Sequence, residues 1–591
     1  FPQEFAKPEA KRKRVHHHRT AINMITMLFS WLSLGEVSVA PASCRLGAPL
    51  SPRQWREIDG LRSSVGVWSR HPAVDVGDLG RMADKAVNYD QQVSLLQNAV
   101  DAIRQDVDVY ALRKSNLMTF RQQQPFGRDP GTVVVGTAAK SDFNTTKSVK
   151  CDRLKFHGTP TFDPRPYLVD TYKDLFDHPS LFQKPPDGPV PRVQVRASRR
   201  DFVRFLELLD RTGRLLLRPA SDSDPQKRVG LHAVYKDADW DRLILDARAA
   251  NLHEAGFSYW VKHLGAASIL LEIVLDSDEA LACYGDDLRD FYHVFQVSDE
   301  RAQRNTFNKV LKPLEVKHLK SYFDELGLSP EVTASLRTLA MGDHNAVELA
   351  QQVHLALGLR SKALSSDKLI SLSLPCPRGP YRAGIIIDDH LGFESERCQC
   401  FDARGLPIPS PEPPRDAEAP AAFSAMRAAY AACGLAYHPG KATWRVFESV
   451  GWGAQVNGIE GWVSSPIARV IFLSNITMTI ASLGFVTVEL LESLVGCWVG
   501  VKLQRRRALC LLDLAYEALR GREPTDILAL SSALRQELLS WVIIAPMLNT
   551  DLRAKPPSKL HLTDASSFKV ALVSSDISPC LSKELLRHTV T

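Results

Sequence analysis

The chain of 591 residues has few cysteines, and they follow no recognisable pattern. Ten cysteines are about average for this length, and their spacing gives no disulfide framework. Cys398 and Cys400 form a single CxC pair without a second pair at zinc-ligand spacing, which argues against a structural zinc site. No internal repeat is visible in the sequence.

A large excess of one charge is also missing. Lysine and arginine total 73 residues against 67 aspartates and glutamates, so the net charge is +6. This mild excess permits a nucleic-acid partner without requiring one. Hydrophobic residues at 45% and charged residues at 24% are ordinary for globular protein and exclude a wholly disordered, collagen-like or coiled-coil chain. The length suffices for about three to five packed units.

No hydrophobic run in the N-terminal segment is long enough to span a bilayer. The first residue is Phe, which indicates a fragment, a processed chain or an incomplete gene model. Basic residues 11–19 precede an apolar run at 22–34, an order typical of secretory signals, and Lys11–Arg14 also resembles a nuclear-import cluster. The run has about thirteen residues and is diluted by polar ones, so we expect a short helix or untranslated leader instead. We therefore expect a nuclear or cytoplasmic location and no membrane partner.

Proline-rich stretches and periodic patterns organise the rest of the chain. Residues 178–192 contain five prolines and predict a linker, while 401–420 predict an exposed proline-rich insertion. Hydrophobic periodicity and alternation predict a helix over 199–210, a hairpin within 230–251, mainly helices over 463–548 and a β-type stretch at 559–575.

Two acidic motifs carry the chemistry. Asp287 follows an apolar stretch in YGDDLRDFYHVF, and Asp388 and Asp389 follow three isoleucines in GIIIDDHLGF. Taken singly, the first is a strand entering an acidic-capped helix and the second an Asp-Asp turn of an ordinary hairpin. Together they supply carboxylates for two divalent ions about 4 Å apart, as nucleotide-joining enzymes require. We therefore expect Asp287, Asp388 and Asp389 to bind two Mg²⁺ ions.

Six motifs in chain order resemble those of retroelement reverse transcriptases. They are DRLILDARAAN (241–251), DLRDFYH (287–293), LAMG (339–342) with the helical run to His354, IIDD (386–389), GLAYHPGK (434–441) and VGWGAQVNG (450–458). In the first motif, the family's Arg, Asp-x-Arg and Asn fall on Arg242, Asp246, Arg248 and Asn251. The resemblance covers about residues 190–550.

The resemblance implies an α+β right-hand polymerase of fingers, palm and thumb with an antiparallel palm sheet. Its implied activity is RNA-directed DNA synthesis, a nucleotidyl transfer that uses an RNA or DNA template-primer, deoxynucleoside triphosphates and Mg²⁺. The expected parts are an N-terminal region of unknown role with the linker (1–190), fingers and palm (191–462), a helical thumb or connection (463–555) and a truncated ribonuclease H-like start (556–591). In the last part, LTDAS (562–566) resembles the first strand of ribonuclease H, which makes Asp564 the first carboxylate of that site. A chance surface strand is the alternative.

The resemblance also suggests individual roles. Lys236 and Arg242 would neutralise the triphosphate, and Tyr292 would pack under the sugar and exclude a 2′-hydroxyl. Gly342 would lie near the templating base pair, and Lys441 would be the general acid toward pyrophosphate. A further group would bind the nucleic-acid backbone from a thumb helix: Lys502, Arg505, Arg506 and Arg507. The structural alternatives are core packing for Tyr292, a helix start for Gly342 and solvated surface charges for the cations.

Three departures from the family pattern bear on activity. Ile386 stands where the family has tyrosine, Ala340 replaces proline, and 343–345 is an unusual Asp-His-Asn continuation. These changes leave the carboxylates intact but weaken the expectation of efficient catalysis. The alternatives are a catalytically lapsed nucleic-acid-binding protein of the same descent and a fragment of a decayed element without a stable fold.

Overall fold

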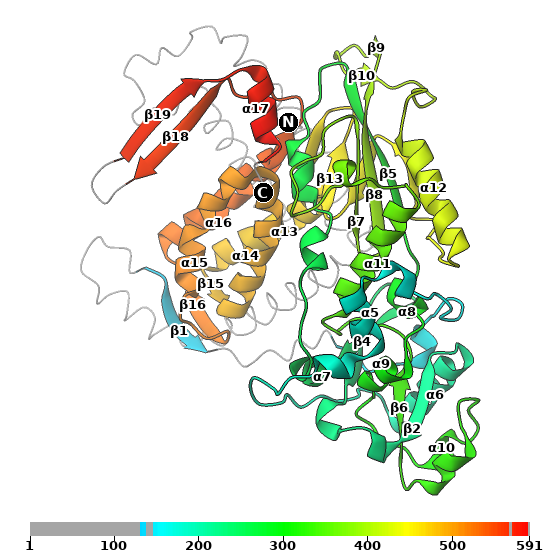
Figure 1. Cartoon of the computed structure of the whole chain (residues 1–591). Helices are drawn as coiled ribbons and strands as arrows, with labels where there is room; N and C mark the ends of the chain where they lie inside the picture. The colour runs from blue at the N-terminus through cyan, green and yellow to red at the C-terminus, as the bar shows by residue number, and fades with distance from the viewer. Residues whose placement is uncertain (1–130, 138–145, 566–569, 589–591) are drawn as a thin grey trace, which may run out of the picture. The chain divides into compact units, whose positions relative to one another are not determined.

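The computed structural model describes residues 131–137, 146–565 and 570–588 (Figure 1). The signal-like segment predicted at 11–34 lies outside these residues. The chain divides into two compact units, which are treated separately below. In its described residues, the sheet unit comprises 146–463 and 551–588, and the helical unit comprises 131–137 and 464–550. Helices and antiparallel sheets occur together, so the fold is α+β.

A four-stranded antiparallel sheet forms the centre of the sheet unit (Figure 1). Its strand order is β11 (Thr443–Val446), β5 (Glu279–Asp287), β8 (Asp389–Arg397) and β7 (Tyr381–Ile386). The consecutive strands β7 and β8 form the hairpin predicted from the isoleucine run. β5 pairs with β8 over its whole length, from Glu279 opposite Arg397 to Asp287 opposite Asp389.

The two faces of this sheet pack against different partners. Ala282 and Tyr284 of β5 share a core with α11 (Ala346–Arg360) and α12 (Ala419–Ala432), whose Phe423 ring lies 5.4 Å from that of Tyr284. Leu281 and Cys283 belong to a second core on the other face. This alternation is the two-residue period of a strand buried on both faces. The helices therefore leave the opposite face of the sheet to other elements.

Two separate two-stranded antiparallel sheets also belong to the sheet unit. β3 (Gly230–Tyr235) and β4 (Asp241–Asp246) form the predicted hairpin, and β2 (Leu215–Pro219) pairs with β6 (Val332–Leu336). The predicted helix is α6 (Arg199–Arg211), which buries Phe202, Phe205 and Leu209. Ser198 caps it by accepting a hydrogen bond from the Asp201 amide. The spacing of apolar residues was sufficient to predict α6 and the β3–β4 hairpin, whereas β2 and β6 were not predicted.

The remaining regular elements of the sheet unit are short. They are α5 (Asp170–Asp177), α7 (Arg248–Leu252), α8 (Phe291–Val294), α9 (Asp299–Arg304), α10 (Pro313–Val316), β9 (Cys400–Phe401), β10 (Pro407–Ile408), β12 (Glu448–Gly451), β13 (Ala454–Asn457) and β14 (Trp462–Ser464). β9 and β10 lie at the start of the proline-rich insertion, in which half of the residues are exposed and Pro407 and Ala419 are buried. The segment predicted as a linker begins with a 3₁₀ helix, Pro179–Phe182, whose Pro179 is buried, so this part of it is packed.

The helical unit has its own core. Four helices make most of it: α13 (Ile467–Leu483), α14 (Val488–Lys502), α15 (Asp513–Leu519) and α16 (Ser532–Ile544). Trp498 and Trp541 meet in its centre with ring centroids 6.0 Å apart. The sequence predicted mainly helices here, and the structure adds a small sheet of β1 (Val133–Thr137), β16 (Asp526–Ala529) and β15 (Phe485–Thr487). β17 (Asn549–Asp551) follows, where the chain leaves this unit.

The last described segment is a hairpin followed by a helix. β18 (Lys559–Ala565) pairs with β19 (Val570–Asp576), and α17 (Pro579–Leu586) comes next. Apolar side chains on the hairpin are exposed, Leu562 by 71% and Leu572 by 64%. The β-type stretch predicted here is therefore two strands, and its ribonuclease H-like identity stays a prediction. In the described part of the chain, no helix combines the length and apolar character needed to cross a membrane.

Candidate active site

The two acidic motifs meet at one end of the central sheet. Asp287, the last residue of β5, is the direct cross-strand partner of Asp389, the first residue of β8. Side chains of directly paired residues lie on the same face with Cβ atoms about 4.5–5.5 Å apart. The Leu288 amide donates to the carbonyl of Asp388 at 3.0 Å, which holds the β7–β8 turn against the end of β5. Two motifs separated by about a hundred residues therefore form one acidic group.

The strand period also decides which face of the sheet carries the acids. Asp287 lies two and four residues beyond Gly285 and Cys283, and Asp389 lies two residues before Leu391. Cys283 and Leu391 pack in the core on the face away from α11 and α12. The neighbours Asp286 and His390 point the other way: Asp286 pairs with Arg427 of α12 at 2.7 Å, and the His390 ring stacks on Phe423. The helices thus cover Asp286, while Asp287 and Asp389 lie on the opposite face of the sheet.

Burial and mutual repulsion raise the pKa values of two of these acids. The pKa of Asp388 rises to about 6, first because burial disfavours its charge and then because of the Asp287 carboxylate. The pKa of Asp389 rises to about 7 through burial and then through Asp388 and Asp287. The charge of Asp287 thus acts on both Asp388 and Asp389, and a cation that binds between these acids would relieve the repulsion.

Two basic residues already oppose this charge. Lys441 Nζ forms an ion pair with Asp287 Oδ2 at 2.5 Å. Arg242 on β4 lowers the pKa of Asp388, which places its guanidinium within electrostatic reach of the acids. Lys236 lies in the turn of the same hairpin, where its amide donates to the Trp240 carbonyl at 3.2 Å. Lys441 thus contacts Asp287, and Arg242 acts on Asp388 through its charge. Triphosphate binding by Lys236 and Arg242 stays a prediction.

The carboxylates suit a divalent ion by their chemistry but do not form a finished cage. Within the described residues, no three His, Cys, Asp or Glu side chains converge in an arrangement that could hold a metal ion. Lys441 occupies one carboxylate oxygen of Asp287. Carboxylate oxygens are the ligands that Mg²⁺ prefers, and the pKa values of Asp388 and Asp389 are raised first by burial and then by neighbouring carboxylates. Metal binding would therefore require Lys441 to leave and the side chains to turn inward.

Tyr292 lies in α8, close to the acids. The left-handed backbone of Asp290 (φ 49°) precedes this short helix. Tyr292 is 8% exposed and belongs to the core that includes α11 and α12. Its pKa is raised by burial and then by the charges of Asp388 and Asp343. Core packing is therefore part of its role, while contact with a nucleotide sugar stays a prediction.

Gly342 is required by its contact with β4. Its φ is +109°, and a Cβ atom at this position would lie 1.9 Å from the carbonyl oxygen of Leu245. The Leu245 amide donates to the Met341 carbonyl at 3.0 Å, and Asn251 Nδ2 donates to the Gly342 carbonyl at 3.0 Å. The LAMG motif is therefore attached to the Arg242-bearing hairpin through its backbone. The suggested approach to a templating base pair is untested.

The Asp-His-Asn continuation has a structural explanation that the sequence did not suggest. Arg301, fully buried in α9, pairs with Asp343 at 2.5 Å and with Glu254 at 2.9 Å. Asn345 donates from Nδ2 to Glu254 at 2.9 Å, and Arg304 pairs with both acids. Buried charges need such partners to remain ionised. Residues 343–345 therefore fix the turn before α11 through a balanced ionic network.

One predicted nucleic-acid contact is wrong. Lys502 is fully buried in the helical unit, where its Nζ donates to the Leu511 carbonyl at 3.1 Å and lies 4.2 Å from the Trp541 ring centroid. Burial lowers the pKa of Lys502 to about 7, against the opposing effect of Glu537. A buried amine cannot contact a phosphate backbone. Arg505 and Arg507 are exposed and Arg506 is partly exposed, so the prediction stands for these three.

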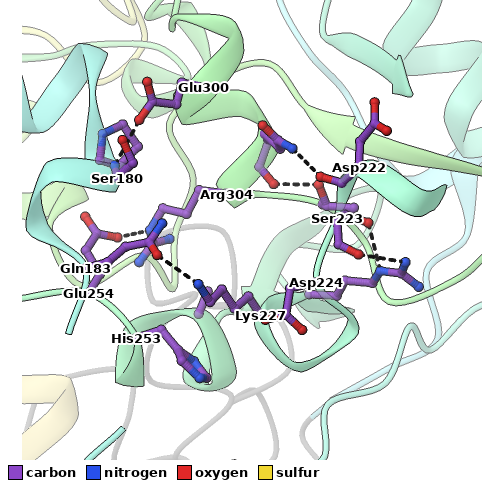
Figure 2. Close-up of a pocket in the computed structure, with 15 residues that line it drawn as sticks. Ser180, Gln183, Asp222, Ser223, Asp224, Lys227, His253, Glu254, Glu300 and Arg304 are labelled. Atoms are coloured by element: carbon purple, nitrogen blue, oxygen red, sulfur yellow. Dashed lines mark hydrogen bonds and ion pairs between the residues drawn. The ribbon is translucent and has the colours of Figure 1, made fainter. Parts of the chain in front are cut away.

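A separate pocket lies in the sheet unit, beside α7 and α9 (Figure 2). Its volume is about 260 Å³, below the roughly 300–1,000 Å³ of common ligand sites. Lys227 donates to Gln183 at 2.8 Å, and the Ser180 amide donates to Glu300 at 2.9 Å. The lining includes both acidic and basic side chains, so it favours no particular charge.

Comparison with known proteins gives weak similarity only. No protein-family model and no curated protein sequence matches this chain. It is similar to foamy viral protease-reverse transcriptase dRH with double-stranded DNA, at 12% identity and a TM-score of 0.42, over 68% of this chain and 57% of that one. The foamy viral protease-reverse transcriptase with double-stranded DNA is 11% identical, with a TM-score of 0.41, over 69% of this chain and 74% of that one. The same protein with an RNA/DNA hybrid is 11% identical, with a TM-score of 0.39, over 70% of this chain and 48% of that one. This chain thus spans little more than half of the first of these proteins. The function must be argued from the site itself.

Proposed function

We propose that this chain is a template-directed nucleotidyltransferase, an RNA-directed DNA polymerase that acts with two Mg²⁺ ions. The observation that carries the proposal is the direct pairing of Asp287 with Asp389, with Asp388 in the adjoining turn. Three acids whose charges oppose one another gain most from divalent cations. The order of the six motifs supports the same assignment.

In this proposal the sheet unit supplies fingers and palm, and the helical unit supplies the thumb. Asp287, Asp388 and Asp389 would hold the ions, which on binding activate a primer 3′-hydroxyl and neutralise the triphosphate. Arg242 and Lys236, which lie on the β3–β4 hairpin of the fingers, pair with the triphosphate oxygens. The exposed Arg505 and Arg507 and the neighbouring Arg506 bind the backbone of the template-primer.

Lys441 is suited to deliver a proton. Its ammonium already lies at the carboxylate of Asp287, on the side where the acids gather. Displaced from Asp287, the ammonium can protonate the pyrophosphate oxygen as its bond to the α-phosphorus breaks. Tyr292, held by the core beside Asp388, packs against the sugar and leaves no space for a 2′-hydroxyl. These groups complete a deoxynucleotide-selective polymerase.

The second candidate is a nucleic-acid-binding protein that no longer polymerises. The Lys441–Asp287 ion pair favours it, because this contact satisfies a carboxylate that an active site would reserve for metal. The isoleucine at 386 in place of tyrosine points the same way. In this case binding to template-primer would persist without Mg²⁺-dependent synthesis.

Primer extension distinguishes the two candidates. The purified chain is incubated with a primed RNA or DNA template, deoxynucleoside triphosphates and Mg²⁺, beside Asp388→Asn prepared in the same way. Extension by the original chain alone supports the polymerase. Binding of template-primer without extension, by protein that melts cooperatively, supports the second candidate.

A further inference from the structure

The turn that carries Asp388 has an unfavourable backbone conformation. Strands β7 and β8 are joined by only two residues, Ile387 and Asp388. Ile387 has φ +55°, in the left-handed region. Two-residue hairpin turns that need positive φ normally use glycine, asparagine or aspartate, and a β-branched residue there is a genuine outlier. Such a conformation persists only when surrounding contacts hold it.

One buried amide holds both sides of this turn. Gln351 of α11 is fully buried, and its Oε1 accepts a hydrogen bond from the Ile387 amide at 2.8 Å. Its Nε2 donates to the Ile385 carbonyl at 3.0 Å and to the His263 carbonyl at 3.2 Å. The side chain therefore links the last part of β7 to the strained residue itself.

A histidine one turn later on the same helix holds the other end of that residue. His354 Nδ1 lies 2.7 Å from the Ile387 carbonyl, and Nε2 lies 2.7 Å from the Tyr430 hydroxyl. A carbonyl can only accept, so Nδ1 carries the hydrogen and Nε2 accepts from Tyr430. Burial lowers the pKa of His354 to about 4, which keeps this neutral form near pH 7. Both polar backbone groups of Ile387 thus have side-chain partners.

We propose that Gln351 and His354 are positioning residues, which hold the strained Ile387 turn and thereby fix the carboxylate of Asp388. This inference rests on the proposed function of the acids. The helix α11 starts at Ala346, after the turn of residues 343–345 that follows Gly342, and Gly342 contacts β4. Helix α11 therefore connects the turn after Gly342, beside the β3–β4 hairpin, to the β7–β8 turn that carries Asp388.

The chain supplies a matched control at the next position. Gln352 lies in the same helix, is 1% exposed, and its side-chain amide has no hydrogen-bond partner among the described residues. Gln352→Ala thus removes the same atoms as Gln351→Ala from the same buried helix, without a contact to the turn. A loss through general destabilisation would affect both variants.

A double-mutant cycle with Ile387 tests the mechanism. We expect Gln351→Ala to lower kcat for primer extension about tenfold to a hundredfold, because misplacing a reacting group by about 1 Å costs up to that much. KM for the nucleotide and Kd for template-primer should change little, and Gln352→Ala should resemble the original chain. Glycine adopts positive φ without strain, so in an Ile387→Gly background the loss from Gln351→Ala should be much smaller. Equal losses in both backgrounds, or equal losses for Gln351→Ala and Gln352→Ala, would overturn the proposal.

The role of His354 can be tested by conservative replacement. Asparagine places its Nδ2 donor near the position of the histidine Nδ1, whereas glutamine reaches toward the position of Nε2. His354→Asn should therefore retain much more kcat than His354→Gln. The reverse order would mean that the Tyr430 contact, and not the turn, is what matters.

A readout that needs no catalysis separates this inference from the proposed function. Amide hydrogen exchange at Ile387 should accelerate in Gln351→Ala and remain slow in Gln352→Ala. If the folded original chain extends no primer, the polymerase proposal fails while the exchange result still decides whether Gln351 holds the turn. If exchange at Ile387 is unchanged in Gln351→Ala, the positioning role is wrong even in an active polymerase.

Discussion

The ammonium of Lys441 is bound to the carboxylate of Asp287, at 2.5 Å between Nζ and Oδ2. The proposed general acid thus occupies an oxygen of a proposed metal ligand. A positive side chain in this place compensates part of the acidic charge before any other cation arrives. The two roles are therefore coupled, because the Asp287 oxygen is freed only when Lys441 moves.

Replacement of Lys441 should lower two quantities, the rate of primer extension and the Mg²⁺ concentration that it requires. Lys441→Gln should lower kcat for primer extension by about 10²-fold or more through loss of the general acid. The Mg²⁺ concentration for half-maximal rate should fall, since no ammonium competes at Asp287. A Mg²⁺ titration of the extension rate measures both, with the exposed Lys320→Gln as the control. A higher Mg²⁺ requirement in Lys441→Gln would contradict the competition.

Asp388→Asn should abolish primer extension and leave template-primer binding almost unchanged. The substitution removes a proposed metal ligand but no phosphate contact. Extension assays and binding titrations on the same preparation test this. Extension by Asp388→Asn at the rate of the original chain would show that the chemistry does not depend on Asp388.

Tyr292→Ala should admit ribonucleotides. Excluding one additional oxygen is worth roughly 1–3 kcal/mol, or a factor of about 5 to 150 in selectivity. Because Tyr292 is buried, the same substitution should also lower the free energy of unfolding by about 3–5 kcal/mol. Competitive incorporation of deoxy- and ribonucleotides measures selectivity, and Tyr292→Phe, which keeps the ring, is the control. Unchanged selectivity in a folded Tyr292→Ala protein would limit this residue to the core.

The acidic group predicts a pH-dependent stability. The pKa values of Asp388 and Asp389 are raised to about 6 and 7, above the ordinary value of about 3.9 in an unfolded chain. The native state therefore binds protons more tightly, and its stabilisation is complete below about pH 4 and lost as pH rises through 6 to 7. Asp389→Asn should raise the free energy of unfolding at pH 8 by on the order of 1–3 kcal/mol and change it little at pH 4.

Thermal melts of Asp389→Asn at both pH values check this, without added metal. The exposed Asp239→Asn serves as the control, since this side chain lies in the β3–β4 turn. Equal shifts in melting temperature at pH 4 and pH 8 would show that the Asp389 charge is not destabilising.

Lys502 predicts the opposite trend in the helical unit. Its pKa is lowered to about 7 from about 10.4, so folding releases a proton between these values and stability rises with pH over this range. Lys502→Met removes the buried charge, and the Trp541 indole still donates to the Leu511 carbonyl. The free energy of unfolding of the variant should be higher at pH 7 by on the order of 1 kcal/mol. Between pH 7 and pH 10 it should rise less than that of the original chain. Denaturant unfolding at both pH values measures this, and a less stable variant at pH 7 would contradict it.

Local pattern was enough to predict several elements of the fold. Helix α6, the β3–β4 hairpin and the strands of the β7–β8 hairpin each depend on the spacing of apolar residues along the chain. The sequence also indicated which acids belong together, because a two-metal site needs the strand with Asp287 to lie beside the hairpin with Asp388 and Asp389. The metal ligation itself stays a prediction.

Only the tertiary structure decided which polar side chains lie inside. Lys502 belongs to a basic run that has the same composition whether buried or exposed, and only packing around Trp541 places its amine in the core. Gln351 and His354 lie on a helix predicted only as part of a motif, and their partner is the backbone of Ile387, 33 to 36 residues away. Hydrogen bonds to backbone groups leave no side-chain pattern in a sequence, so the support of the Asp388 turn became visible only when α11 was packed against the sheet.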